Sequence, residues 1–401
     1  MSAWSELLRH GRGRVLLFCL AGWVFDFFDL ILFAFVKVQV ASDLELSLTG
    51  HIAVVDGATL FATAFGGLAF GRLGDRVGRR RALTLSILCY AAGAGATAFA
   101  EGYGSLLLAR ALTGLGVGGE WGIGHAIVAE TFPGDQRDRA HAILQAGSPL
   151  AMALAAAVGC FAAPAFGWRV CYLAAALPAL LVFAARWALP GDDRAPGRSG
   201  GSLRELWSPR HRRPAAALLL LLTLHMTGFW CVYAWLPTAL QQQANATPQQ
   251  VGWFQIAINS VHIAADVGFG FLAARYGRVR MLVTFCLVFA AGQALVAWRL
   301  PSLLGDATFT VAIALMGVGA GTWSCFGALF GQHFPEQVRA TAASASYSLA
   351  RGVQLPSQLL MGQLFLWTNS FAPALWVGAA CALASALAAG LLPRAPRRPP
   401  I

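Results

Sequence analysis

The sequence has little charge and almost no lysine. Only 12% of its 401 residues are Asp, Glu, Lys or Arg, and 57% are hydrophobic, whereas a soluble domain has roughly 25% charged residues. Its one lysine, Lys37, ends an apolar run, and we expect its ammonium group to reach outward to the membrane surface. So little charge excludes a surface that mostly faces water, and it indicates a protein of the lipid bilayer.

The sequence also lacks the spacings of a metal or catalytic centre. Its eight cysteines all lie inside apolar segments, which favours small buried thiols over metal ligands. It has no nucleophile motif, no nucleotide-binding loop and no appended soluble domain. We therefore expect neither an enzyme nor a bound metal or cofactor.

Apolar runs long enough to cross a bilayer fill most of the chain. A spanning helix needs about 20 apolar residues. The predicted helices are 15–40, 51–71, 81–100, 104–131, 139–163, 168–189, 214–240, 249–273, 279–299, 303–331, 338–366 and 371–393. The sequence thus predicts an all-α membrane protein with twelve transmembrane helices.

One segment near the midpoint differs from the rest, because residues 190–213 are rich in Gly, Pro, Ser and Arg. Such a composition is typical of a loop. We therefore predict a six-helix bundle over residues 1–190, a cytoplasmic linker over 191–213 and a second six-helix bundle over 214–401.

The basic residues fall on alternate loops. With the N-terminus in the cytoplasm, most of the 29 Lys and Arg lie in cytoplasmic segments, which matches the positive-inside rule. This placement predicts an inner-membrane protein with both termini cytoplasmic, and it argues against nucleic acid as the partner of the +11 charge. Three arginines precede the first apolar run as in a signal peptide, but the run contains Asp26 and Asp29 and has no obvious cleavage site, so we expect it to be retained.

Two loop motifs recur in the second half of the chain. GRLGDRVGR at 71–79 matches GFLAARYGR at 270–278, and ETFPGDQR at 130–137 matches QHFPEQVR at 332–339. The two offsets, 199 and 202 residues, nearly agree. The halves are therefore predicted to be structural repeats, as in many secondary transporters, with the substrate site between them.

The first of these motifs resembles the signature of the major facilitator superfamily between helices 2 and 3, through Gly71, Asp75, Arg76, Gly78 and Arg79. The resemblance covers the whole chain and implies two six-helix repeats. A narrower resemblance, to proton-coupled symporters of organic acids such as sialate and lactate, lies in DFFDL at 26–30, ARALTGLGVGGEWG at 109–122, RAHAILQAGSPLA at 139–151 and YSLARG at 347–352. Two positions depart from these patterns, since Ser148 replaces an expected aromatic residue and Ala274 stands where the first half has Asp75.

The resemblance implies that Asp75, Arg79 and Glu130 form a charge relay that holds the cytoplasmic side closed, with Arg76 and Arg137 in the same gating set. Exposed ion pairs contribute roughly 0–1 kcal/mol each, which suits a latch that must open. Alternatively, these arginines only set the topology.

Three buried acids are candidates for proton coupling: Asp26, Asp29 and Glu120. An ionised side chain at mid-bilayer costs roughly 2.5–3.5 kcal/mol, so such residues usually have a function. Asp26 and Asp29 lie on one helical face, and their repulsion and burial both favour binding of a proton. A structural hydrogen bond to a neighbouring helix is the alternative for each. The glycines at 114, 116, 118 and 119 predict close helix packing beside Glu120.

Two arginines predicted inside helices, Arg351 and Arg110, could hold an anion. A guanidinium binds a carboxylate with two hydrogen bonds, and Arg351 has no acid in its own predicted helix. Its anion is either a carboxylate of the first helix or the substrate, and the resemblance favours the substrate. The predicted substrate site therefore comprises Arg110, Tyr347, Arg351, Gln354 and Gln358.

Other polar residues of the predicted helices carry weaker hypotheses. His125 and His225 could shuttle protons, although a packing role is the simpler interpretation. Trp121, Trp230 and Trp323 could shape a pocket. Further cavity candidates are Asp56, Asn259, His262 and Asp266.

Together these features predict a proton-coupled symporter that takes up a small organic acid, such as a monocarboxylate, a sialate or an aromatic acid, by alternating access. The alternative is a proton-antiport exporter of drugs or metabolites with the same fold. The expected partners are the organic anion, protons and membrane lipids, and we expect the protein to be monomeric.

Overall fold

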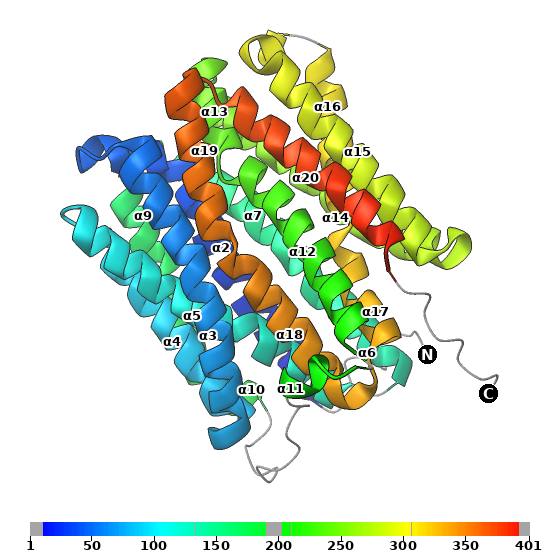
Figure 1. Cartoon of the computed structure of the whole chain (residues 1–401). Coiled ribbons are helices and arrows are strands. Elements are labelled where there is room, and N and C mark those ends of the chain that lie inside the picture. Colours follow the sequence, from blue (N-terminus) through cyan, green and yellow to red (C-terminus); the bar gives the residue numbers. More distant parts are fainter. Residues whose placement is uncertain (1–10, 133, 190–202, 210, 306, 393–401) are drawn as a thin grey trace.

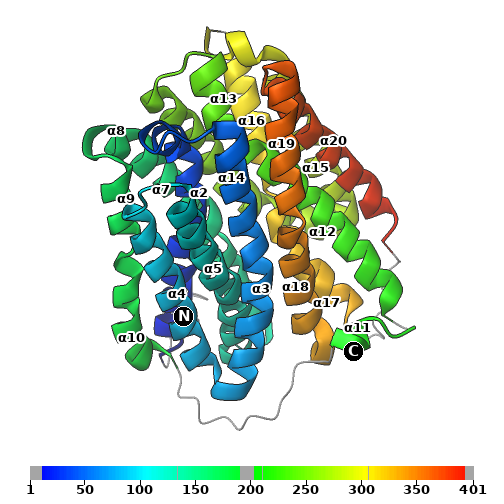
Figure 2. The same cartoon turned by 60° about the vertical axis from the view of Figure 1, so that its left-hand side comes forward.

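The computed structural model describes residues 11–132, 134–189, 203–209, 211–305 and 307–392. These residues are almost entirely helical and pack side by side into one bundle, with no strand among them (Figures 1 and 2). The predicted all-α class is therefore confirmed.

The N-terminal half contains the first six predicted spans. They are α2 (Arg12–Asp43), η2 and α3 (Leu48–Ile52, Ala53–Val77), α4 (Arg79–Ala98), α5 (Tyr103–Thr131), α6 to α8 (Gly134–Gln145, Gly147–Ala157, Ala163–Phe166, with η3 at Val158–Ala162) and α9 with α10 (Trp168–Ala175, Leu181–Ala188, around η4 at Leu177–Leu180). Each predicted helix is found, and most ends agree within a few residues.

The C-terminal half contains the other six. They are α12 with α13 (Arg212–Tyr233, Leu236–Gln243), α14 (Pro248–Tyr276), α15 (Arg278–Arg299, then η5 at Leu300–Gly305), α16 with α17 (Thr308–Ala320, Trp323–His333), α18 with α19 (Glu336–Gly352, Gln354–Thr368) and α20 (Ala372–Gly390). Several spans are thus divided into two helices. One break falls between α18 and α19, where Pro356 occupies the first turn of α19 and has no N–H to donate.

The predicted linker is described only in part. A short helix, α11 (Leu203–Leu206), lies within it, and α12 begins at Arg212. Residues 191–202 and 210 lie outside the described part of the chain.

Within the described ranges, nine helical stretches are long and apolar enough to cross a membrane by length and composition alone. The other three predicted spans are α4, α5 and α18 with α19. They contain more polar residues, such as the arginines that open α4 and the buried Arg110, Glu120 and Arg351. All three pack against the apolar helices, so the bundle shields the buried Arg110, Glu120 and Arg351 from lipid.

The two halves meet in a reciprocal pattern. The second span of the N-terminal half, α3, packs against the fifth of the other half, α18 and α19 (Figure 2), and α14 packs against α7 in the same way. Small residues allow the first contact, because a side chain at Gly57 would overlap Leu355 and one at Gly67 would overlap Ser348. This pattern places the space between the halves at the centre of the bundle.

The glycines of α5 bring three helices close together, as predicted. A side chain at Gly114 or Gly118 would overlap the backbone of α3 at Thr59 or Thr63, and one at Gly116 would overlap Tyr90 of α4. Arg110 and Glu120 of the same helix are also buried inside the bundle.

Candidate transport site

A central pocket lies between the two halves and is lined mainly by aromatic side chains. Its lining residues are Trp23, Phe27, Gln145, Ser148, Met152, Met226, Phe229, Trp230, His262, Trp323 and Tyr347. Of the tryptophans considered from sequence, Trp230 and Trp323 line it. Tyr347, predicted as part of the substrate site, also lines it, whereas Trp23, Phe27 and Phe229 were not predicted, because aromatic residues are plentiful throughout this sequence and carry no distinguishing signal.

Aromatic rings also join the halves beside this pocket. Trp121 of α5 stacks on Tyr347 of α18, with ring centroids 4.1 Å apart and planes 6° from parallel. Phe27 of α2 approaches Trp230 of α12 at 6.3 Å. Ser148, where the sequence pattern would have an aromatic residue, lines the same pocket. A planar, partly apolar solute suits such surroundings.

Arg351 lies next to the pocket and contacts it through Tyr347. Its Nη2 donates to the Tyr347 hydroxyl at 3.3 Å, and its guanidinium lies 4.7 Å from the centre of that ring. The side chain is buried, and its Nε has no hydrogen-bond partner. The predicted anchor therefore retains a free donor.

The two predicted glutamines next to Arg351 have protein partners. Gln354 donates to Thr227 Oγ1 at 3.2 Å, and Gln358 Oε1 accepts from Trp235 Nε1 at 2.7 Å. Neither glutamine is among the lining residues of the central pocket. Their contacts support a role in holding α19 against α12 and the turn that follows it.

Asp26 of α2 and Glu120 of α5 form a buried acidic pair. None of their four carboxylate oxygens has a hydrogen-bond partner, and Glu120 packs directly over Gly22 of α2. Arg351 is close enough to attract Asp26 electrostatically, although no hydrogen bond joins them. Two carboxylates that are buried together repel each other when both are charged. A proton bound by the pair relieves this repulsion.

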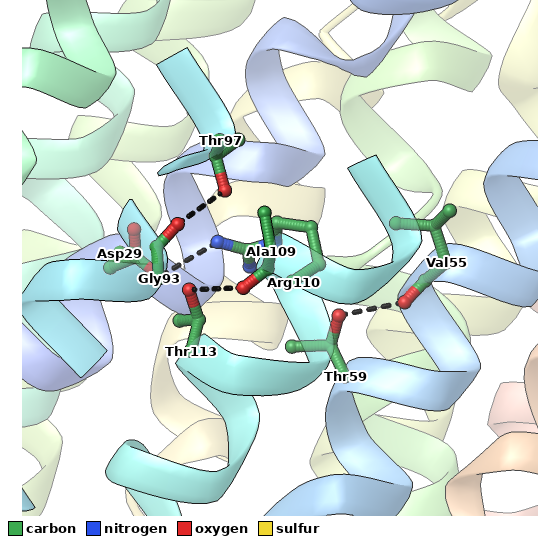
Figure 3. A network of polar contacts seen from close by, with 8 residues as sticks. All are labelled: Asp29, Val55, Thr59, Gly93, Thr97, Ala109, Arg110 and Thr113. Atoms are coloured by element: carbon green, nitrogen blue, oxygen red, sulfur yellow. Dashed lines mark hydrogen bonds and ion pairs between the residues drawn. The ribbon is translucent and has the colours of Figure 1, made fainter. Parts of the chain in front are cut away.

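Asp29 has a different partner from Asp26. Its Oδ2 accepts from Arg110 Nη1 at 2.7 Å, and both side chains are buried (Figure 3). Thr113 and Thr59 nearby donate to backbone carbonyls of their own helices, at 3.2 and 2.7 Å, and so offer the ion pair no hydroxyl hydrogen. Arg110 thus already holds an anion of the protein.

Arg110 also faces a second pocket. This pocket is lined by Leu30, Ala34, Asp56, Thr59, Leu60, Arg110, Trp230 and Ala234. Trp230 lines both pockets and therefore lies between them.

Lys37 lies inside the bundle, and the prediction that it extends to the membrane surface is wrong. Its side chain is fully buried, its Nζ lies 3.0 Å from Asp56 Oδ2, and it sits 3.7 Å from the ring centre of Trp235. Helix α2 continues to Asp43, so Lys37 is not at the helix end, and Asp56 supplies the countercharge that lipid cannot. We call these three residues the Lys37 contact. It joins α2 and α3 of one half to the turn after α12 of the other.

The predicted charge relay is present at the opposite end of α3. Arg79 Nη2 lies 2.9 Å from Asp75 Oδ1, and its Nε lies 3.7 Å from Glu130 Oε1. We call these three residues, all in the N-terminal half, the Arg79 contact. Arg137 donates from Nε to the Phe132 carbonyl at 3.2 Å. Arg76 is exposed and has no ion pair with a described residue.

Two histidines bond to neighbours within their own half. His125 Nδ1 lies 2.9 Å from the Trp121 carbonyl, and His225 Nε2 lies 2.9 Å from Thr322 Oγ1. These contacts agree with the packing interpretation.

Known proteins resemble the chain over nearly its full length. The family profile described as Major Facilitator Superfamily matches residues 18–353 and 218–401. A "Probable 4-methylmuconolactone transporter" of Cupriavidus pinatubonensis is 30% identical over 383 residues, which are 91% of this chain and 86% of that protein. The "Gentisate transporter" of Corynebacterium glutamicum is 26% identical over 95% of this chain and 88% of its own. The crystal structure of a D-xylose-proton symporter superposes with a TM-score of 0.75 at 16% identity, covering 93% of this chain and 96% of that one.

Proposed function

Because the chain belongs to the Major Facilitator Superfamily, a family of membrane transporters, we propose that it is a proton-coupled symporter of a small ring-bearing organic acid. One observation carries this proposal. A buried guanidinium with a free donor, Arg351, lies between an aromatic pocket and an acidic pair without hydrogen-bond donors.

The acid would bind with its ring in the central pocket and its carboxylate on Arg351. The rings of Trp230, Trp323 and Tyr347 supply the apolar walls, and stacking would orient a planar solute. The free Nε of Arg351 can donate a charge-assisted hydrogen bond to the carboxylate. The names of the two relatives agree with such a cargo, since gentisate is an aromatic carboxylate and 4-methylmuconolactone a ring-bearing acid.

Proton coupling would follow from competition for Arg351. When Asp26 is ionised, it attracts the guanidinium. A proton bound by Asp26 removes that attraction and frees Arg351 for the substrate. Substrate and proton therefore bind together, and each raises the affinity for the other by the same factor. Asp29 and Arg110 would hold α2 and α5 in place through their ion pair.

By the positive-inside rule, the Arg79 contact would lie at the cytoplasmic face of the inner membrane and the Lys37 contact toward the outside. Alternating access then requires the contact of Lys37 with Trp235, which crosses between the halves, to form or break as the halves rock, whereas the Arg79 contact moves with the N-terminal half. We propose a monomer, because the central pocket is lined by residues of both halves of one chain.

Uptake into proteoliposomes tests this function. Purified protein would be given radiolabelled benzoate, gentisate, nicotinate and N-acetylneuraminate, with D-xylose as a neutral comparison, under an inward proton gradient. We expect at least one acid to accumulate, and accumulation to stop when a protonophore removes the gradient. Failure of every acid to accumulate, together with proton-driven efflux of a neutral or cationic compound, would favour the exporter.

Arg351→Gln keeps a polar side chain but removes the charge. We expect the apparent affinity for the acid to fall about tenfold or more, since a hydrogen bond to a charged group contributes about 1.5–3 kcal/mol. Arg76→Gln removes an arginine that is exposed at the end of α3 and is the matched control. Equal uptake by the two variants would exclude Arg351 as the anchor.

A further inference from the structure

We propose that His262 and Asp266 form a second proton-binding site, which contacts the transported anion from the C-terminal half. The inference rests on the proposed symport function and extends it. It concerns a buried pair of titratable side chains that neither Arg351 nor the acidic pair requires.

The two side chains lie on consecutive turns of α14. His262 Nε2 and Asp266 Oδ2 are 3.5 Å apart, and the side chains are 1% and 7% exposed. At this distance any hydrogen bond between them is weak. Ser324 lies close to Asp266 and the Ala320 backbone lies close to His262, but no well-formed hydrogen bond ends on either ring nitrogen of His262 or on either oxygen of Asp266. Buried polar groups in proteins are nearly always paired, so the pair is available to a proton or a ligand.

His262 is also positioned to meet the substrate. It lines the central pocket together with Trp323 and Tyr347. An acid whose ring lies among these side chains can therefore be approached from Arg351 on one side and from the imidazole on the other. Asp266 does not line the pocket and would act through His262.

No charged side chain of a neighbouring described helix pairs with His262 or Asp266. His225 of α12 is a titratable group near enough to interact electrostatically with His262, and it is bonded to Thr322. The helices packed against α14 carry few other titratable groups. Helices α7 and α16 have none, and α17 has Cys325 and His333. Helix α15 has Cys286, with arginines only near its two ends. The cysteine of η3 is Cys160. Ser324 is the polar neighbour of Asp266.

Charge balance couples this pair to the anion. With one proton the pair is neutral, and with two it carries a positive charge that is costly in a buried site unless an anion is near. Arrival of the carboxylate in the pocket would offset that charge and favour uptake of the second proton from water. Release of the acid on the other side would return the proton to water. Each anion would thus travel with the proton of the acidic pair and one more.

Calorimetry of the full-length protein in detergent tests this stoichiometry. The ligand is whichever acid of the uptake panel binds, titrated in buffers of different ionisation enthalpy so that the heat reports the protons taken up. We expect about two protons per anion in the unmodified protein, about one in His262→Gln, and about one in Asp26→Asn. Removal of the imidazole should also weaken binding about tenfold, the value of one hydrogen bond to a charged group.

His225→Gln is the matched control, because His225 is an equally buried histidine of the same half that does not line the pocket. The His225→Gln variant should take up about two protons per anion, as the unmodified protein does. His262→Asn provides a second variant if His262→Gln does not fold, and it too should take up about one proton per anion. Binding of the acid with only one proton in the unmodified protein, or unchanged proton uptake in both variants, would overturn the inference. Absence of binding by every acid would instead reject the symport function itself.

Discussion

The Lys37 contact and the Arg79 contact, at opposite ends of α3, differ in burial and in what they join. Lys37 is fully buried, and its contact crosses from one half to the other through Trp235. Arg79, Asp75 and Glu130 are 28%, 44% and 45% exposed, and all lie in the N-terminal half. Water screens the ion pairs of the Arg79 contact, which therefore contribute only roughly 0–1 kcal/mol each. The Lys37 contact is not screened in this way.

The comparison also indicates which bond must break when the halves separate. The ion pair of Lys37 with Asp56 lies within the N-terminal half and can move with it. The contact of Lys37 with the Trp235 ring crosses the interface, and a desolvated cation–π contact contributes about 2 kcal/mol. The molecule can therefore open at this end without exposing an unpaired buried charge.

Asp56→Asn should have the largest effect, because it leaves Lys37 buried without a countercharge. Removal of one partner of a buried ion pair costs about 3–5 kcal/mol. We expect a marked fall in the thermal denaturation midpoint in detergent. The double variant Lys37→Met/Asp56→Asn should recover most of the loss, and an unchanged midpoint in Asp56→Asn would contradict the burial of the pair.

Trp235→Leu should have the next largest effect, on conformation more than on folding. Loss of about 2 kcal/mol across the interface would raise the population open at this end about thirtyfold. Hydrogen–deuterium exchange at η2 and α13 should become faster. Trp235→Phe keeps a ring but loses the hydrogen bond to Gln358. Its exchange rate should therefore lie between those of the unmodified protein and Trp235→Leu. Equal exchange in all three proteins would show that Trp235 does not hold the halves together.

Arg79→Gln should change stability by about 1 kcal/mol or less, because its ion pairs are half-exposed. The difference from the unmodified protein should shrink in 1 M NaCl, where the screening length is about 3 Å. The effect of Asp56→Asn should persist at that salt concentration. An Arg79→Gln effect as large as that of Asp56→Asn would remove the distinction between the two ends.

Arg76→Gln should have the smallest effect. Arg76 is exposed and makes no ion pair with a described residue, and substitutions at such sites usually change stability by less than about 0.5 kcal/mol. The same thermal measurements check this. A loss equal to that of Arg79→Gln would place Arg76 in the Arg79 contact, as the sequence predicted.

The predictions that succeeded rest on local sequence patterns. A run of apolar residues forms a spanning helix almost wherever it lies, which is why twelve spans were predicted from composition. The contact of Asp75 with Arg79 joins residues four apart across a short turn, so its geometry is nearly local. The glycines of α5 also indicated close packing, although not which helices they meet.

Partner choice among buried charges could not be predicted. Asp26 and Asp29 share one face of α2, yet Asp26 lies with Glu120 and Arg351 while Asp29 pairs with Arg110. Three residues along a helix change the direction of a side chain by only about 60° but shift it about 4.5 Å along the helix axis. Asp29 therefore lies in another layer of the bundle than Asp26. Which residues occupy each layer depends on how α2, α5 and α18 are placed beside one another.

The amino-acid sequence by itself determined that this chain lives in the membrane, how many times it crosses, and that its halves repeat. Those features follow from burial of apolar runs and from charge in the loops, which act on each segment separately. The tertiary structure alone decided that Lys37 is buried against Asp56 and Trp235 and that His262 faces the central pocket. In a low dielectric the energy of a charge depends on its nearest partner, and that partner comes from a distant part of the chain.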